Sequence, residues 1–107
     1  MNPQEIKEGN ERIKDLMGGT IKIQQEDVKD IPLAFLTVDD LKFHVSWKWL
    51  MPVVIKIEEE LGHVVTIEGH SCKIQADDDT SFEQEADSKL EAIWQSIVSF
   101  LEWKEDQ

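Results

Sequence analysis

The segment from Ser88 to Lys104 restricts the possible folds more than any other part of the sequence. Ser88 and Glu91 have the spacing of a capping box, in which serine and glutamate satisfy each other's exposed amides at the start of a helix. Apolar residues then recur at helical spacing: Leu90, Ile93, Trp94, Ile97 and Leu101. The pattern predicts an amphipathic helix over 88–104, whose apolar face must pack against other elements.

A first helix is predicted at the start of the chain. Asn2 is a good N-cap before Pro3, and Gly18-Gly19 provides a stop. One face of this helix is apolar and holds Ile6, Ile13, Leu16 and Met17.

A central helix is predicted over 47–61, between the N-cap residue Ser46 and Gly62. Its apolar stripe consists of Trp47, Leu50, Met51, Val54, Ile57 and Leu61. Pro52 removes one backbone hydrogen bond and is expected to kink or tighten the first turns.

Alternating apolar residues predict strands over 20–24, 33–38, 63–68 and 71–76. The last two form a hairpin around Gly69-His70, and the polar stretches 25–30 and 77–87 are interpreted as a turn and an acidic loop. The predicted order is α-β-β-α-β-β-α. Because none of these elements can bury its apolar face alone, we expect one α+β domain over 1–107. It would have a mostly antiparallel sheet of three to four strands packed with three helices.

The negative charge is concentrated in the second half of the chain. The net charge is −12, and residues 1–56 carry −1 whereas residues 57–107 carry −11. Such a surface repels nucleic acid and anionic membranes and attracts basic surfaces. Acidity also favours solubility without any partner.

A single cysteine, Cys72, excludes an internal disulfide. No apolar run is long enough for a membrane helix, and the first residues lack the features of a secretory signal. We therefore expect a cytoplasmic protein.

Two blocks of the sequence resemble a group of small, mostly uncharacterised phage and prophage proteins of Bacteroidetes-type bacteria. The blocks are 44–58, which reads HVSWKWLMPVVIKIE, and 88–103, which reads SKLEAIWQSIVSFLEW. A Met17-Gly18 pair at the end of the first helix also matches that group. The layout is similar to the phage alpha-beta-alpha sandwich domain. The resemblance implies that fold and a mobile-element origin, and it transfers no catalytic motif.

Metal and catalytic sites are weakly indicated. His70 and Cys72, with His63 across the hairpin, fall short of the four ligands of a zinc site. The acidic run at 77–85 lacks the glycine and spacing of an EF-hand. No phosphate-binding loop or nucleophile motif is present. We expect no metal, no cofactor and no enzymatic activity, although a small enzyme that acts on a basic or metal-bound substrate is an open alternative.

The tryptophans divide into two pairs. Trp47 and Trp94 lie on apolar stripes and are predicted to be core residues. Trp49 lies off its stripe and Trp103 lies near the chain end. These two either pack against neighbouring elements or, if exposed, anchor an interface.

The acidic residues of the second half are the main candidate site. They either form one patch that faces the Arg and Lys residues of a partner or are scattered over a solvated surface. The predicted partner-binding residues are Glu58, Glu59, Glu60, Asp77, Asp78, Asp79, Glu83, Glu85 and Asp87, with Trp49 and Trp103.

These features favour a phage-encoded inhibitor that occupies the basic nucleic-acid channel of a host defence protein, such as a CRISPR effector nuclease. It would bind neither nucleic acid nor membrane. The alternative is a structural or regulatory phage protein that self-associates.

Overall fold

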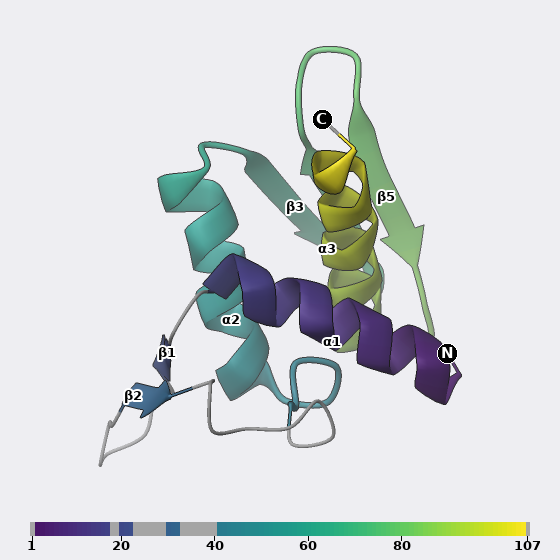
Figure 1. Ribbon diagram of the computed structural model, residues 1–107. Coiled ribbons are helices and arrows are strands. Elements are labelled where there is room, and N and C mark those ends of the chain that lie inside the picture. The colour runs from purple at the N-terminus through teal and green to yellow at the C-terminus, as the bar shows by residue number, and fades with distance from the viewer. Residues whose placement is uncertain (1, 18–19, 23–29, 33–40, 107) are drawn as a thin grey trace.

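The computed structural model describes residues 2–17, 20–22, 30–32 and 41–106 (Figure 1). In chain order the elements are α1 (Pro3–Met17), β1 (Thr20–Lys22), β2 (Asp30–Pro32), α2 (Trp47–Ile55), the π-helical turn η3 (Lys56–Glu60), β3 (Val64–Glu68), β4 (Ser71–Gln75), β5 (Ser81–Glu85) and α3 (Lys89–Glu105). The predicted α+β class is confirmed, with three α-helices and a three-stranded antiparallel sheet in the described residues.

The main sheet has the strand order β3-β4-β5. The predicted hairpin of β3 and β4 is present, and Gly69 takes the positive φ of 57° that its turn requires. β5 corrects the prediction of a loop over 77–87. It pairs with β4 and sets Phe82 opposite Ile74. Its alternation was obscured because serine and glutamate occupy the exposed positions, so the segment reads as polar.

β1 and β2 form a separate two-stranded antiparallel sheet, in which Thr20 pairs with Pro32. β1 begins where the alternation predicts a strand. β2 includes Asp30, which corrects the prediction of a turn over 25–30 at that residue. The strand predicted over 33–38 lies outside the described residues. The element order therefore differs from the predicted one by the added β5 and by this separate pair.

The central helix ends differently from the prediction over 47–61. Regular α-helix stops at Ile55, and the five residues of η3 continue the chain in the wider π form. Pro52 lies inside α2 and has no N–H to donate to the preceding turn. Ser46 is at the N-cap with an extended backbone, but its side chain makes no capping hydrogen bond within the described residues.

α3 packs on one face of the main sheet and α1 packs across α3 (Figure 1). The buried residues of α3 face inward toward β4, where Cys72 and Ile74 are fully buried. Near the C-terminal end of α3, Phe100 makes edge contacts with His63 and Phe82 at ring-centre distances of 5.0 and 6.3 Å. The opposite face of the sheet carries no helix in the described part of the chain.

The prediction that Trp47 is a core residue is wrong, and of the two alternatives left open for Trp49 the structure shows packing against a neighbouring segment. Trp49 is only 8% exposed and packs edge-on against Phe43 at 5.3 Å, whereas Trp47 is 41% exposed. The buried face of α2 contains Trp49, Leu50, Val53 and Val54. Periodicity could not choose this face because Lys48 is the only charged residue among the nine of α2.

Candidate partner-binding surfaces

The turn between β4 and β5 carries three successive aspartates and is held closed by hydrogen bonds. The carboxylate of Asp77 accepts a bond from the backbone N–H of Asp79 at 2.9 Å. The side-chain amide of Gln75 donates to the carbonyls of Asp77 and Thr80. The backbone N–H groups of Ala76 and Asp77 donate to the same Thr80 carbonyl, at 2.9 and 3.2 Å. Asp78 and Asp79 remain exposed at the tip, which projects beyond the body of the molecule (Figure 1).

The bonds in this turn also fix the charge of Asp77. The backbone N–H of Asp79 and the side chain of Thr80 hold the pKa of the Asp77 carboxyl below its ordinary value, and nearby His63 lowers it further. Asp77 is therefore ionised at neutral pH, and the bonds of the turn hold its carboxylate in place.

The outer face of the sheet extends this acidic turn along β5. Glu83 and Glu85 are exposed there and lie two residues apart, which is roughly 7 Å along an extended strand. Glu68 joins them, because the register places Glu68 opposite Ser71 and Ser71 opposite Glu85. Lys73 lies opposite Glu83 as a counter-charge. Asp87 follows β5 and is exposed.

A shallow hollow of about 290 Å³ opens on this outer face, and Thr66, Glu68, Ser71, Lys73 and Glu83 line it. The β4–β5 hairpin and its flanks thus bring together Asp77, Asp78, Asp79, Glu83, Glu85 and Asp87 of the predicted acidic set. We call these six residues the hairpin carboxylates.

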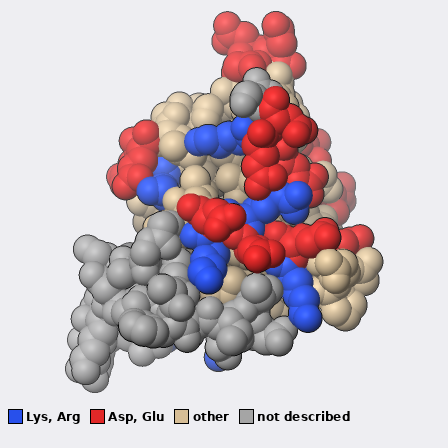
Figure 2. All heavy atoms as spheres, viewed as in Figure 1, with Lys and Arg blue, Asp and Glu red and all other residues tan. Residues whose placement is uncertain are grey.

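Glu58, Glu59 and Glu60 form a second acidic group at the end of η3. All three are exposed, and Glu60 pairs with Lys56 at 2.5 Å. β3 begins soon after them at Val64, opposite Gln75 at the end of β4, so both groups belong to the same end of the sheet. Figure 2 nevertheless shows the acidic side chains over η3 and those over the β4–β5 turn as two groups with uncharged residues between them. On this face the two groups do not form one continuous acidic patch, which was one of the two alternatives drawn from the sequence.

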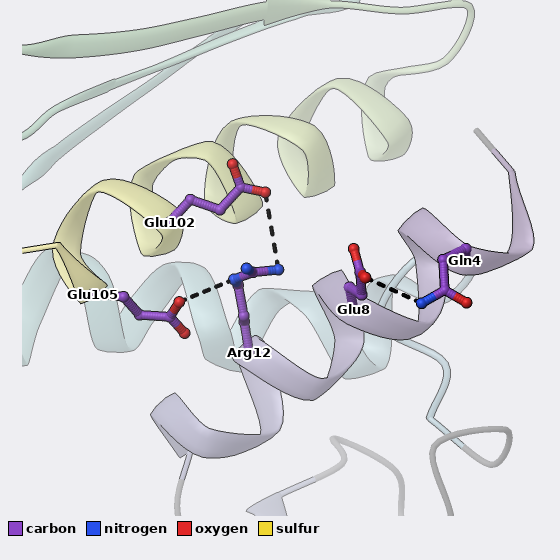
Figure 3. Close-up of polar contacts among 5 residues, drawn as sticks. All are labelled: Gln4, Glu8, Arg12, Glu102 and Glu105. Carbon is purple, nitrogen blue, oxygen red and sulfur yellow. Dashed lines mark hydrogen bonds and ion pairs between the residues drawn. The ribbon is translucent and has the colours of Figure 1, made fainter.

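A third acidic region, which the sequence interpretation missed, lies where α1 crosses α3. Arg12 is at its centre. Its Nε donates to Glu105 at 3.2 Å and its Nη1 lies 3.9 Å from Glu102 (Figure 3). Two adjoining hollows of about 280 and 240 Å³ share Glu8 and Arg12. The carboxylates that line them are Glu5, Glu8, Glu11, Asp15, Glu102 and Glu105.

The larger hollow has an apolar floor of Trp94 and Val98, with the amides of Gln84 and Gln95 at its wall. Counting charges by halves of the chain hid this region, because residues 1–56 are nearly neutral overall. The sequence does contain a signal for this region. Glu5, Glu8 and Asp15 lie seven, four and three residues from Arg12, and in a helix this spacing places all four side chains on one face.

The predicted aromatic anchors are largely covered. Trp49 is buried, so it offers no exposed surface to a partner. Trp103 is partly buried and packs against Phe82 and Phe100 at ring-centre distances of 5.9 and 6.1 Å. The exposed tryptophan is Trp47, which forms an apolar strip along α2 with Met51 and Ile55.

His70 and Cys72 do not come together as ligands. Cys72 is fully buried, where burial raises the pKa of its thiol, and His70 is exposed in the hairpin turn. Within the described ranges, no group of three or more His, Cys, Asp or Glu residues is arranged to hold a metal ion.

None of the described helices combines the length and apolar character needed to cross a membrane. No family model, curated protein or solved structure matches this chain.

Proposed function

We propose that this protein is a non-catalytic phage protein that inhibits a host nucleic-acid-binding protein by occupying its basic channel in the cytoplasm. A CRISPR effector nuclease is the concrete form of such a target. The observation that carries the proposal is the hairpin: six exposed carboxylates lie in the β4–β5 turn, on the outer side of β5 and just after β5.

The fixed geometry of the hairpin supports this function. Its turn is closed by Asp77, Gln75 and Thr80, so the charges need little ordering when a partner binds. Within the described residues the outer face of the sheet carries no helix, and a basic groove can therefore approach Glu83 and Glu85 directly. The net charge of −12 would also accelerate encounter with a basic surface.

The experiment is a competition assay with purified, guide-loaded CRISPR effector nucleases. We expect one of them to bind this protein and to lose binding of its DNA substrate, with an affinity that falls steeply as salt rises. The test variant carries Asp78→Asn, Asp79→Asn, Glu83→Gln and Glu85→Gln. The matched control carries Glu58→Gln, Glu59→Gln, Glu11→Gln and Asp106→Asn, which remove the same charge at exposed positions and leave all six hairpin carboxylates unchanged.

We expect the test variant to lose at least tenfold more affinity than the control. Equal losses in the two variants would assign binding to net charge alone. Binding that is insensitive to salt, or no inhibition of any effector, would contradict the proposed mechanism.

The apolar strip of α2 favours a second candidate function, a phage accessory protein that self-associates. Trp47 and Ile55 are 41% and 38% exposed and lie two turns apart. Light scattering tests this alternative: a stable dimer that Trp47→Ser converts to a monomer would support it. A monomer at all concentrations would leave the inhibitor as the better proposal.

A further inference from the structure

A buried network of polar groups joins α1 to α3 and to the segment before α2. Asn10 is 1% exposed and lies at its centre. The indole N–H of Trp94 donates to Oδ1 of Asn10 at 2.9 Å. The Nδ2 group of Asn10 lies 3.3 Å from the carbonyl oxygen of Leu41 and 3.0 Å from Nδ1 of His44.

The partners of Asn10 determine the protonation of His44. An indole N–H can only donate, so Oδ1 of Asn10 must face Trp94. The carbonyl of Leu41 can only accept, so the Nδ2 amino group must face Leu41 and His44. Nδ1 of His44 is then an acceptor, and the neutral ring carries its proton on Nε2.

From this polarity we infer that His44 is an acid-sensitive latch, which holds α1 against α3 while the ring is neutral and releases α1 when Nδ1 gains a proton. A proton on Nδ1 would point at the amino group of Asn10. Both groups would then be donors, and the hydrogen bond between them would be lost. Rotating the Asn10 amide would not help, because its amino group would then face the indole N–H and its oxygen the Leu41 carbonyl.

The surroundings of His44 act in the same direction. Burial lowers the pKa of His44 below its ordinary value. The ring also lies edge-on to Trp94, with ring centres 6.5 Å apart. Among the described residues, eight charged side chains lie within four positions of Asn10, Trp94 or His44, on α1, α3, the 41–46 segment and α2: Lys7, Glu8, Glu11, Arg12, Lys14, Glu91, Lys42 and Lys48.

The sign of the pH effect follows from the lowered pKa. The unfolded or undocked chain takes up a proton near pH 6.5, whereas the docked state resists it to lower pH. The stabilisation from a neutral His44 is therefore complete above about pH 6.5 and is lost as the pH falls through the lowered pKa.

The release is expected to be local, because α1 has little else that is buried. Its buried residues are Gly9, Asn10 and Ile13, whereas α3 contributes seven buried residues to the core. Elements with few buried contacts open before the rest of the structure. Undocking would also separate Arg12 from Glu102 and Glu105 and open the hollow between the helices.

Hydrogen exchange between pH 7.5 and 5.0, expressed as protection factors, tests the latch. We expect the opening constant of α1 to rise by up to tenfold per pH unit below pH 6.5, as for uptake of one proton, while α3 keeps its protection. His44→Gln keeps an acceptor that cannot titrate and should remove this pH dependence. His70→Gln, at an exposed histidine, should behave like the wild type.

Three results would overturn the inference: unchanged α1 protection in the wild type, the wild-type pH profile in His44→Gln, or a simultaneous loss of protection in α1 and α3. If His44→Gln does not fold, nitrogen NMR of the wild-type imidazole decides instead. We expect a neutral ring protonated on Nε2, whose titration shifts the Trp94 indole signal. Two results would contradict the latch: a neutral ring protonated on Nδ1, or a Trp94 indole chemical shift that stays constant while His44 titrates.

Discussion

Asn10 and Trp94 are hydrogen-bonded to each other across 84 positions of the sequence, and this bond lies where α1 crosses α3. Both side chains are buried, so the bond is formed away from water and its loss would leave Oδ1 of Asn10 without a partner. The contact fixes the position of α1, and with it the carboxylates of the α1–α3 hollows.

Gly9 allows the two helices to approach this closely. A Cβ atom at position 9 would lie 2.7 Å from Cη2 of Trp94 and 2.8 Å from Cγ2 of Val98. Gly9→Ala should therefore destabilise the protein, because an overpacking cost of about 1–3 kcal/mol exceeds the helix-propensity gain of about 0.5–1 kcal/mol. Urea unfolding followed by circular dichroism measures the difference. Glu11→Ala, on the exposed side of α1, is the control, and a Gly9→Ala protein that is more stable than the wild type would refute the close packing.

Trp49 and Trp47 should respond in opposite ways to truncation. Trp49→Ala removes a buried ring from the Phe43 contact and should cost about 3–5 kcal/mol of unfolding free energy. Trp47→Ala, at a half-exposed position, should cost about 1 kcal/mol or less. Thermal unfolding of the two variants side by side distinguishes them. Equal destabilisation would mean that α2 is rotated from the orientation described.

Ser96 links α3 to the sheet through a buried hydrogen bond. Its hydroxyl donates to the carbonyl oxygen of Cys72 at 2.7 Å. Ser96→Ala should lower the free energy of unfolding by about 0.5–1.5 kcal/mol. The nearby Ser99→Ala, at a partly buried position, serves as a comparison in the same chemical denaturation experiment. A neutral effect at position 96 would show that the bond adds nothing to stability.

Replacing Arg12 should change the charge of the α1–α3 hollows more than it changes the free energy of unfolding. Its ion pairs are with Glu102 and Glu105, whose side chains are more than half exposed, so Arg12→Gln should cost less than about 1 kcal/mol. The same change makes the α1–α3 hollows more negative and should raise the association rate with a basic partner at low salt. Stopped-flow binding at two salt concentrations tests this. An unchanged rate would place this region away from the interface.

The turn at Asp77 should resist acid. Its lowered pKa means that the turn bonds are kept above the ordinary carboxyl range and are lost only as the pH falls through the lowered value. Amide chemical shifts of Asp79 between pH 6 and 2 report this step. Asp77→Asn retains an oxygen acceptor without an ionisable group and should abolish the step, whereas Asp78→Asn should leave it in place.

Local signals in the sequence predicted the elements that depend on neighbouring residues. The cap at Ser88 is confirmed, since its hydroxyl accepts the backbone N–H of Glu91 at 3.2 Å. The hairpin around Gly69 is also confirmed. It could be predicted because its turn residue and its two alternating segments are adjacent in the sequence. β5 was missed because Glu83 and Glu85 occupy exposed strand positions and resemble a solvated loop.

The candidate surfaces depend on contacts that no local pattern encodes. The outward face of α2 could not be chosen from a helix that is apolar on nearly every side, so the sequence wrongly placed Trp47 in the core and left Trp49 undecided. The acidic region around Arg12 arises only because α1 crosses α3, and Gly9 and Asn10 are the residues that permit that crossing.

The main sheet is covered by α3 on one face, so successive residues of β5 alternate between packing positions and exposed positions. Phe82 and Gln84 face the helix, whereas Ser81, Glu83 and Glu85 are exposed. Under the proposed function, mutations at the exposed positions would change the surface offered to a partner and leave the packing beneath untouched. A lineage whose target changes could then replace every second residue of this strand and keep the same fold.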